Sequence, residues 1–281
     1  MELNNNPRHV KSLLMNLPKF SLFVLIFVFL FSYFGSLVYS VDAYSLDSDS
    51  ILLQPSLSHF LGTDRLGRDI LARLMEGGKI SLTIGVGSAF IASFIGLLFG
   101  SMAGYFRGKI DKSFVILVDL FLTFPTFFLL LALVSYVNAS AWVLIVIISI
   151  TGWMTTARLI RSESFKITTQ PYIKILNIAN VSKMKILFKY YAPILAPIYF
   201  VSFTFGVGGA ILAESGLSFL GLGIVAPQMS WGTILSGGKD VVEIAWWVSF
   251  FPGLMIFLVT FSLINISNYL QQLTNQKQIQ S

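Results

Sequence analysis

Long apolar stretches dominate the chain and are separated by short polar segments. An α-helix needs about 20 apolar residues to cross a hydrocarbon core of about 30 Å, with about 17 as a lower limit. Five stretches reach the full length, namely 20–39, 81–106, 113–136, 192–213 and 245–269. A sixth stretch, 141–157, is at the lower limit. The pattern predicts an all-α polytopic membrane protein with six transmembrane helices.

The composition agrees with a membrane protein. The 281 residues are 55% hydrophobic and 11% charged, whereas soluble domains carry about 25% charged residues. The first apolar stretch follows basic residues, as a secretory signal would. Its apolar run is longer than the roughly 7–15 residues of a signal core. We therefore expect it to be retained as a membrane anchor.

The distribution of basic residues predicts the orientation, because Lys and Arg in short loops stay on the cytoplasmic side. With the N and C termini in the cytoplasm, most of the 19 basic residues fall in inner segments. The acidic residues of 40–80 and 214–243 then fall outside. The net charge of +6 therefore reflects membrane topology, and no nucleic-acid partner is expected.

A basic island covers residues 158–191, between two apolar stretches, and contains seven basic residues against the single acid Glu163. Its apolar side chains fall into two sets at i, i+3, i+4, i+7 spacing: Tyr172, Ile175, Leu176, Ala179, and then Met184, Leu187, Phe188, Tyr191. The spacing predicts two short amphipathic helices hinged at 180–182. A membrane-embedded chain that projects such a segment into the cytosol is expected to bind a soluble partner there.

The residues offer no catalytic or cofactor site. The chain has no cysteine, and its two histidines, His9 and His59, lie on opposite predicted sides of the membrane. The G-x-G-x-x-A run at 221–226 has no preceding strand, and the Gly-Lys pairs at Lys79 and Lys239 lack the remaining residues of a phosphate loop. We expect no metal and no cofactor, and any ATP hydrolysis must occur on another chain.

Several residues inside the predicted spans are candidates for packing or transport. Gly96, Gly100 and Gly104 line one helix face, which favours close helix packing, with a pore lining as the alternative. Asp119 is an acid within a span, so it forms either an anchoring salt bridge, for which Lys112 is near in sequence, or part of a substrate path. Pro125 is expected to kink its helix.

The outer segments are less regular. The charges between Asp64 and Arg73 are spaced to pair on a helix along the outer interface, either as a solvated helix or as a contact for another protein. Residues 216–223 suit a re-entrant or short helical gate, or plain packing. Our candidates for a gate or subunit interface are the following residues: Asp119, Glu214, Gly216, Gly221 and Gly223.

Several of these segments resemble one known family. Residues 59–69 contain an LGTD-x-x-GRD run, and residues 211–223 contain E-x-x-LSFLGLG. Trp246-Trp247 and the FPGL run at 251–254 are similar to further elements of the same group. This group comprises the inner-membrane permeases of peptide and nickel ABC importers, and the chain most resembles the C-type subunit of dipeptide or oligopeptide permeases.

The resemblance implies a type I ABC importer permease in a bacterial inner membrane. Its partners would be a homologous second permease subunit, two cytosolic ATPase subunits and an external substrate-binding protein, and its substrates dipeptides or oligopeptides. A permease for nickel or another small solute is the alternative within the family. An ion-driven secondary transporter is disfavoured by the single intramembrane acid and the lack of an evident repeat, and a membrane enzyme by the lack of catalytic groups.

The resemblance also assigns the basic island as the loop that couples to the ATPase. In the family this loop carries E-A-A-x-x-x-G followed by I-x-L-P. Alignment on Pro193 places the expected Glu at Lys174, a reversal of charge. The groove of the ATPase is therefore expected either to carry a matching acid or to couple weakly. The residues of this predicted coupling loop are Tyr172, Lys174, Ile175, Leu176, Ala179, Asn180 and Pro193.

The expected organisation has four parts. Residues 1–57 hold the N-terminal segment, the first transmembrane helix and the start of the external loop, and 58–80 form the external interfacial segment. Residues 81–270 form a five-helix permease core that includes the coupling loop at 158–193. Residues 271–281 form a cytoplasmic tail.

Overall fold

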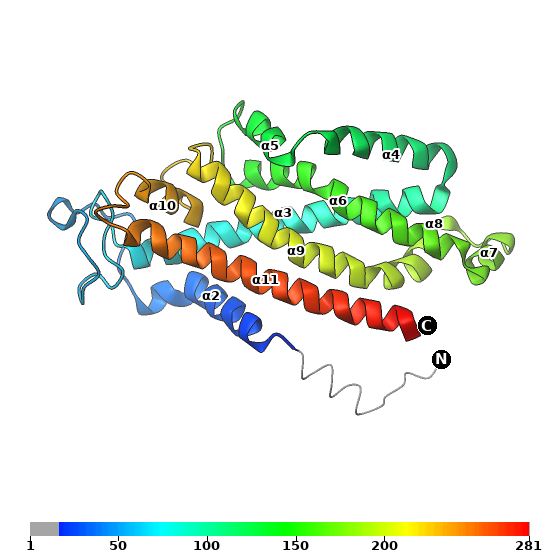
Figure 1. Ribbon diagram of the computed structural model, residues 1–281, viewed down its shortest axis with the longest axis horizontal. Helices are drawn as coiled ribbons and strands as arrows, with labels where there is room; N and C mark the ends of the chain where they lie inside the picture. The colour runs from blue at the N-terminus through cyan, green and yellow to red at the C-terminus, as the bar shows by residue number, and fades with distance from the viewer. Residues whose placement is uncertain (1–16, 281) are drawn as a thin grey trace.

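The computed structural model describes residues 17–280, with side chains described through residue 275. Regular secondary structure in this part is helical, apart from one isolated bridge between Thr63 and Asp69. Figure 1 shows the helices running along a long, narrow bundle. The helices before the middle of the chain are α2 (Lys19–Val38), η1 (Ser48–Ser50), α3 (Ile70–Phe106), α4 (Gly108–Thr123) and α5 (Thr126–Val134). They are followed by α6 (Ala141–Thr169), α7 (Pro171–Ile178), α8 (Lys183–Ile186), η2 (Leu187–Tyr191), α9 (Ala192–Phe219), α10 (Trp231–Gly238) and α11 (Trp247–Gln280).

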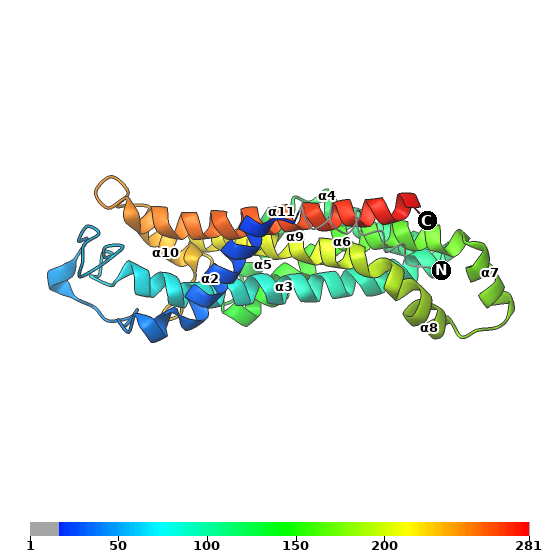
Figure 2. The same cartoon turned by 90° about the horizontal axis from the view of Figure 1, so that it is seen from below.

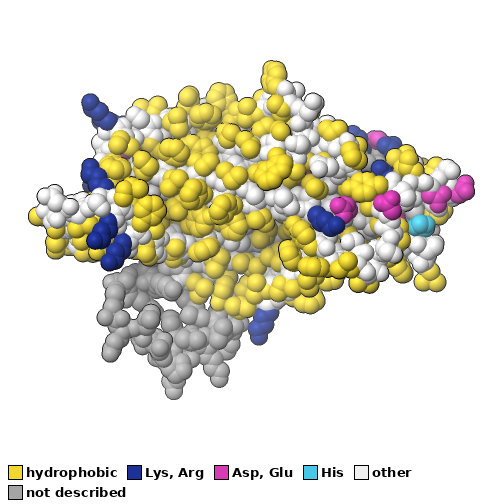
Figure 3. Space-filling view, turned by 180° about the vertical axis from the view of Figure 1, so that it is seen from behind, with side chains coloured by type: hydrophobic (Ala, Val, Ile, Leu, Met, Phe, Trp, Pro, Cys, Tyr) yellow, Lys and Arg dark blue, Asp and Glu magenta, His cyan; other side chains and the backbone are white. Residues whose placement is uncertain are grey.

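The bundle has two chemically different ends. At one end lie α10 and the segment 39–69, which we call the loop end. At the opposite end α7 and α8 project from the bundle, as both views show (Figures 1 and 2), and we call it the elbow end. Figure 3 shows hydrophobic side chains across the long face, basic side chains at the elbow end and most acidic ones at the loop end. A broad apolar belt between two polar ends is what a bilayer requires.

The helices confirm the membrane-protein prediction. Five described helices are long and apolar enough to cross a membrane, or six if one bent pair counts as a span. That pair is α4 and α5, which meet at an angle of 80°. The sequence predicts one kinked span at 113–136, whereas the structure has a break at Phe124 and Pro125. Proline cannot donate a backbone hydrogen bond and restricts the residue before it to extended geometry, and Phe124 is extended.

Other helices are longer than the apolar stretches that predicted them. Helix α3, predicted to begin at residue 81, begins at Ile70. The side chain of Asp69 caps it by accepting a hydrogen bond from the amide of Ala72 at 2.9 Å. Helix α6 continues past the apolar stretch to Thr169. An apolar window marks only the part of a helix that contacts lipid or core, so polar turns at the ends are missed.

The glycines of α3 explain how the two central helices pack. A Cβ built on Gly96 would lie 2.8 Å from Cβ of Thr156, and one on Gly100 would lie 2.5 Å from the carbonyl oxygen of Ala157. Gly104 is similarly closed in by Ser164. This close approach lets α3 and α6 pack backbone to backbone over about two turns. The packing role predicted for the three glycines is confirmed.

Candidate coupling and translocation sites

The elbow, by which we mean α7 and α8, begins with the short helix α7, and one face of α7 packs against the bundle. Ile173 is fully buried, and Asn177 accepts a hydrogen bond from the hydroxyl of Tyr105 on α3 at 2.8 Å. Helix α7 ends where Asn180 adopts the left-handed conformation with φ of +51°. Asparagine tolerates this conformation better than most residues. The predicted hinge is therefore present at Asn180. The predicted second short helix is not a separate element, because α8 and η2 continue directly into α9 as one long helix, Lys183–Phe219.

The opposite face of α7 is uncovered. Ile175 is 64% exposed and Ile178 is 81% exposed, and Tyr172 lies on the same outer surface. Lys174 and Ala179 are also exposed. The predicted apolar stripe is only partly right, because Leu176 packs inward with Ile173, while the other members point outward. The elbow thus presents an apolar surface beside a lysine. Pro193 lies beyond α8, exposed in the first turn of α9.

Two arginines of the basic island belong to the bundle instead of the elbow. Arg161 on α6 forms an ion pair with Asp111 on α4. Arg158 on α6 contacts Asp119 on α4 at 2.6 Å, with both side chains more than half exposed. The salt bridge predicted for Asp119 is present, but Lys112 is the wrong partner. Lys112 is near in sequence, whereas Arg158 comes close only because α6 runs beside α4.

Glu214 is the most deeply buried acid of the described residues, with no exposed surface. Its carboxylate accepts hydrogen bonds from the hydroxyls of Ser218 and Ser230, each at 2.6 Å, and from Ser81 at 3.5 Å. These three serines come from α9, from the start of α10 and from α3. Ser230 also caps α10, so the carboxylate fixes where that helix begins. Within residues 17–275, Glu214 forms no ion pair.

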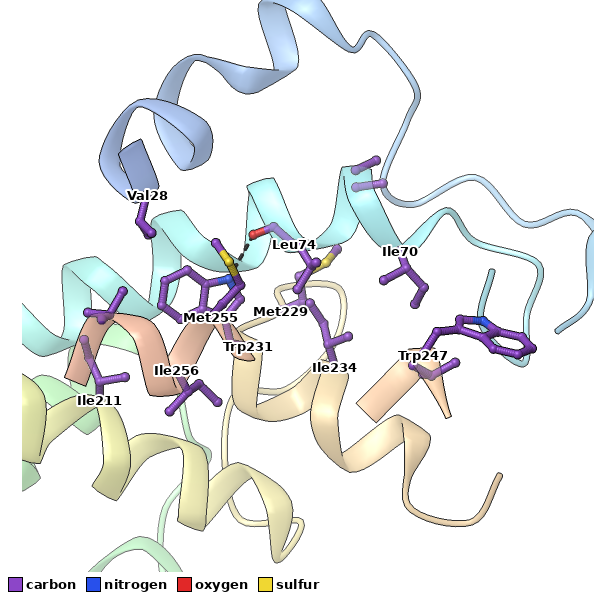
Figure 4. Close-up of a cluster of buried hydrophobic side chains, with 14 of the residues drawn as sticks. Val28, Ile70, Leu74, Ile211, Met229, Trp231, Ile234, Trp247, Met255 and Ile256 are labelled. Atoms are coloured by element: carbon purple, nitrogen blue, oxygen red, sulfur yellow. Dashed lines mark hydrogen bonds between the residues drawn. The ribbon is translucent and has the colours of Figure 1, made fainter. Parts of the chain in front are cut away.

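Trp231 adds further contacts where α3, α9 and α10 meet around Glu214. Its backbone amide donates to the hydroxyl of Ser81 at 3.0 Å, and its indole donates to the carbonyl of Leu74 at 2.9 Å. Figure 4 shows the indole between α3 and α10, within a cluster that includes Ile211 and Met255. Because the ring is fully buried, its N–H needs a partner, and Leu74 supplies one. Polar and apolar contacts together anchor α10 to the bundle.

The segment 216–223 is not a separate re-entrant helix. Helix α9 continues through Phe219, and an irregular segment then leads to α10. Gly216 is inside α9, where a Cβ would lie 3.2 Å from the ring of Phe127. Gly221 has φ of +82°, and a Cβ on Gly223 would overlap Ser218. These two glycines therefore permit the tight turn that returns the chain to Ser230.

The charged residues of the outer segment form a loop, and the prediction of an interfacial helix starting near Asp64 is wrong. Asp64 accepts from the amides of Leu66 and Arg68 at 2.8 and 3.1 Å and pairs with the guanidinium of Arg68 at 2.7 Å. Side chains that bond their own local backbone favour turns over helix. The i, i+4 pair between Asp64 and Arg68 therefore exists without a helix.

Asp69 ties the loop end together. Besides capping α3, it accepts from the hydroxyl of Tyr39 and contacts Nδ1 of His59, both at 2.9 Å. Burial, together with the hydrogen bond to Asp69, raises the pKa of Tyr39 to about 12. The indole of Trp247 donates to the carbonyl of Thr63 at 3.1 Å. The LGTD-x-x-GRD segment is thus an ordered loop that packs over the start of α3, and we call it the folded cover.

A cavity of about 430 Å³ runs between α6 and α9. Its side chains come from α3, α5, α6, α9 and α11, and none of them is charged. The polar groups among them are hydroxyls and amides: Ser88, Ser93, Thr126, Thr151, Thr155, Thr156, Ser202, Ser267, Asn268 and Gln271. None of these residues is among those predicted from the sequence to form a site. The signal for this set was the recurrence of Ser and Thr inside otherwise apolar stretches.

Comparison with known proteins decides the family. Residues 96–278 match the family described as binding-protein-dependent transport system inner membrane component. The chain belongs to this family of permeases. Its members are non-catalytic transmembrane components of the inner membrane, and membership of this family implies in general that an ATPase and a binding protein act with them.

Individual permeases match over most of the chain. The dipeptide transport system permease protein DppC of Bacillus subtilis is 33% identical over 91% of this chain and 80% of its own length. The oligopeptide transport system permease protein OppC of Haemophilus influenzae is 31% identical, over 85% and 76%. The nickel transport system permease protein NikC of Escherichia coli is 30% identical, over 77% and 78%.

Proposed function

We propose that this permease is the translocation subunit of an ATP-driven importer for dipeptides or oligopeptides. The observation that carries this proposal within the family is the lining of the cavity between α6 and α9. Hydroxyl and amide groups can donate to and accept from peptide N–H and C=O groups. An uncharged lining also suits substrates whose side chains vary in charge.

A nickel substrate is the alternative that the relatives raise. Sites that hold nickel ions use imidazole, thiolate or carboxylate ligands, and the cavity lining contains none of these. The cavity therefore favours peptides over a metal ion.

The elbow end is proposed to face the cytoplasm. Several basic side chains gather on its surface, as Figure 3 shows, and the chain has no acid from 164 to 213. Basic loops are retained on the cytoplasmic side of bacterial membranes. The N-terminal residues Arg8 and Lys11, which enter the same argument, lie outside the described residues.

The uncovered face of α7 is proposed as the contact with the ATPase. Tyr172, Ile175 and Ile178 form an exposed apolar surface on a short helix, and such a helix binds by laying that face into a groove on its partner. Ile173 and Asn177 hold the helix to the bundle from the other side. A movement of α7 caused by the ATPase would therefore be transmitted to α3. The reversed charge at Lys174 predicts an acidic residue in that groove.

The binding protein and the second permease are placed by the two ends of the bundle and by the cavity. A binding protein would dock on the folded cover at the loop end, and a second permease would close the open side of the cavity. Residues Asp119, Glu214, Gly216, Gly221 and Gly223 are proposed to act at the gate or at this subunit interface. Glu214 would do so by fixing α10, and Gly221 and Gly223 by shaping the turn before it.

Uptake measurements test this function. We expect cells to take up a radiolabelled dipeptide in a manner that requires this chain and an associated ATPase. An uncoupler that leaves cellular ATP intact should have little effect. Nickel uptake measured in parallel serves as the competing substrate. Uptake that stops with the uncoupler but survives loss of the ATPase would contradict the proposal, and nickel uptake alone would replace the peptide assignment.

A further inference from the structure

An apolar groove of about 180 Å³ lies at the elbow end, separate from the cavity between α6 and α9. One wall is the last turns of α3, with Leu98, Met102 and Phe106. The other wall is the continuous segment from α8 through η2 into α9, with Met184, Phe188 and Tyr191. The Tyr191 hydroxyl is already engaged with Thr168 at 2.7 Å, so the groove offers an almost purely carbon surface.

The groove opens onto the outside of the bundle. Met184 and Phe188 are more than 60% exposed. Along α3 the exposed apolar surface continues from Met102 through Leu98 to Phe94, within a helix long and apolar enough to span the membrane. The groove is therefore continuous with surface that faces the hydrocarbon of the bilayer, and it lies near the end of that helix, where the lipid headgroups begin.

The segment that forms one wall of the groove carries three lysines. Lys183, Lys185 and Lys189 are exposed and lie on the same segment as one wall. The ammonium of Lys183 is 5.2 Å from the centre of the Phe106 ring, which forms part of the opposite wall. None of these lysines forms an ion pair with another residue in the range 17–275. The apolar groove thus has one ammonium group beside Phe106 and two further lysines on the same segment, which contains no acid.

We propose that this groove binds an anionic phospholipid such as phosphatidylglycerol. One acyl chain would lie in the groove between Met102 and Phe188, and the headgroup phosphate would lie against Lys183 and Lys185. Basic pockets at the membrane surface of helical bundles bind anionic headgroups in this way. The charge favours this occupant over a zwitterionic lipid, and the continuity with the bilayer-facing surface favours a lipid over a soluble protein.

The position of the groove gives the lipid a structural role. Its walls are α3 and the π-helical segment η2, which joins the elbow to α9. A bound lipid would hold these two parts together. The inference uses the proposed orientation of the elbow, but lipid binding is measured without transport, so the two proposals fail separately.

Native mass spectrometry of the full chain, released from nanodiscs into mild detergent, tests the proposal. The nanodiscs contain equal amounts of phosphatidylglycerol and phosphatidylcholine. We expect the wild type to retain phosphatidylglycerol selectively. The double variant Lys183→Gln/Lys185→Gln should retain it roughly thirtyfold less, since each of the two lysines near an anionic surface contributes about 1 kcal/mol. The variant Leu98→Trp, which fills the groove, should lose it.

Matched controls distinguish a site from general attraction. Lys109→Gln/Lys112→Gln removes the same charge from α4 at the same end, and Phe94→Trp adds an indole on α3 outside the groove. Both should retain the lipid as the wild type does. Equal retention of the two lipids, or equal loss in both lysine pairs, would overturn the proposal. A cross-link from Met102→Cys to another protein subunit in the assembled transporter would also overturn it.

Discussion

Replacing Gly100 with alanine is expected to destabilise the protein by about 1–3 kcal/mol, the usual cost of overpacking. The new Cβ would lie 2.5 Å from the carbonyl oxygen of Ala157, and a backbone atom inside α6 cannot move aside cheaply. At roughly 2–4 °C per kcal/mol for a chain of this size, the midpoint of thermal unfolding in detergent should fall by several degrees. Tryptophan fluorescence during heating measures it.

The matched control is Gly253→Ala in α11. It makes the same chemical change in a helix, but its Cβ would have only an ordinary contact at 3.9 Å, with Leu235. Because alanine favours a helix over glycine by about 1 kcal/mol, this variant should be as stable as the wild type or more so. Equal midpoints for the two variants would show that α3 and α6 do not pack as closely as described.

Replacing Glu214 with alanine is expected to lower the free energy of unfolding by about 2–4 kcal/mol and to abolish uptake. The change leaves the hydroxyls of Ser218 and Ser230 without their acceptor in a fully buried site, and each unpaired buried group costs about 1–3 kcal/mol. It also removes the contact that positions the start of α10. Thermal unfolding and dipeptide uptake should fall together.

Two further variants show whether the loss of stability comes from the buried hydrogen bonds of Glu214. Glu214→Gln keeps the size and one acceptor oxygen, so it should recover much of the stability. Glu243→Ala removes an exposed acid at the same end and should leave the midpoint unchanged. If Glu214→Ala unfolds at the wild-type temperature, the carboxylate does not hold α9, α10 and α3 together.

The sequence was a good guide to those parts of the fold that depend on local pattern. Helix location follows from apolar stretches, and the hinge at Asn180 follows from the end of one amphipathic stripe. The packing of Gly96, Gly100 and Gly104 could be predicted because small residues every four positions have one physical use in a membrane. The break at Pro125 was underestimated, since a kink and an 80° bend share the same sequence signal.

Features that depend on distant residues could not be predicted in this way. Asp119 has a lysine seven positions earlier, but its partner Arg158 is 39 positions later and is brought near by helix packing. The charges of Asp64 and Arg68 have helical spacing, yet local hydrogen bonds favour a loop. Glu214 was a candidate as an acid beside a motif, but its three serine partners come from three elements.

Cross-linking from the elbow tests the central claim, that α7 couples this permease to an ATPase. Because the chain has no cysteine, Ala179→Cys places a single thiol on the exposed side of the elbow, and Val242→Cys places one at the loop end as a control. With a short thiol cross-linker in native membranes, we expect Ala179→Cys to trap an ATPase subunit and Val242→Cys not to. The residue opposite Lys174 in that ATPase should be acidic. An assembled transporter in which Ala179→Cys never traps an ATPase, or in which only Val242→Cys does, would contradict the account.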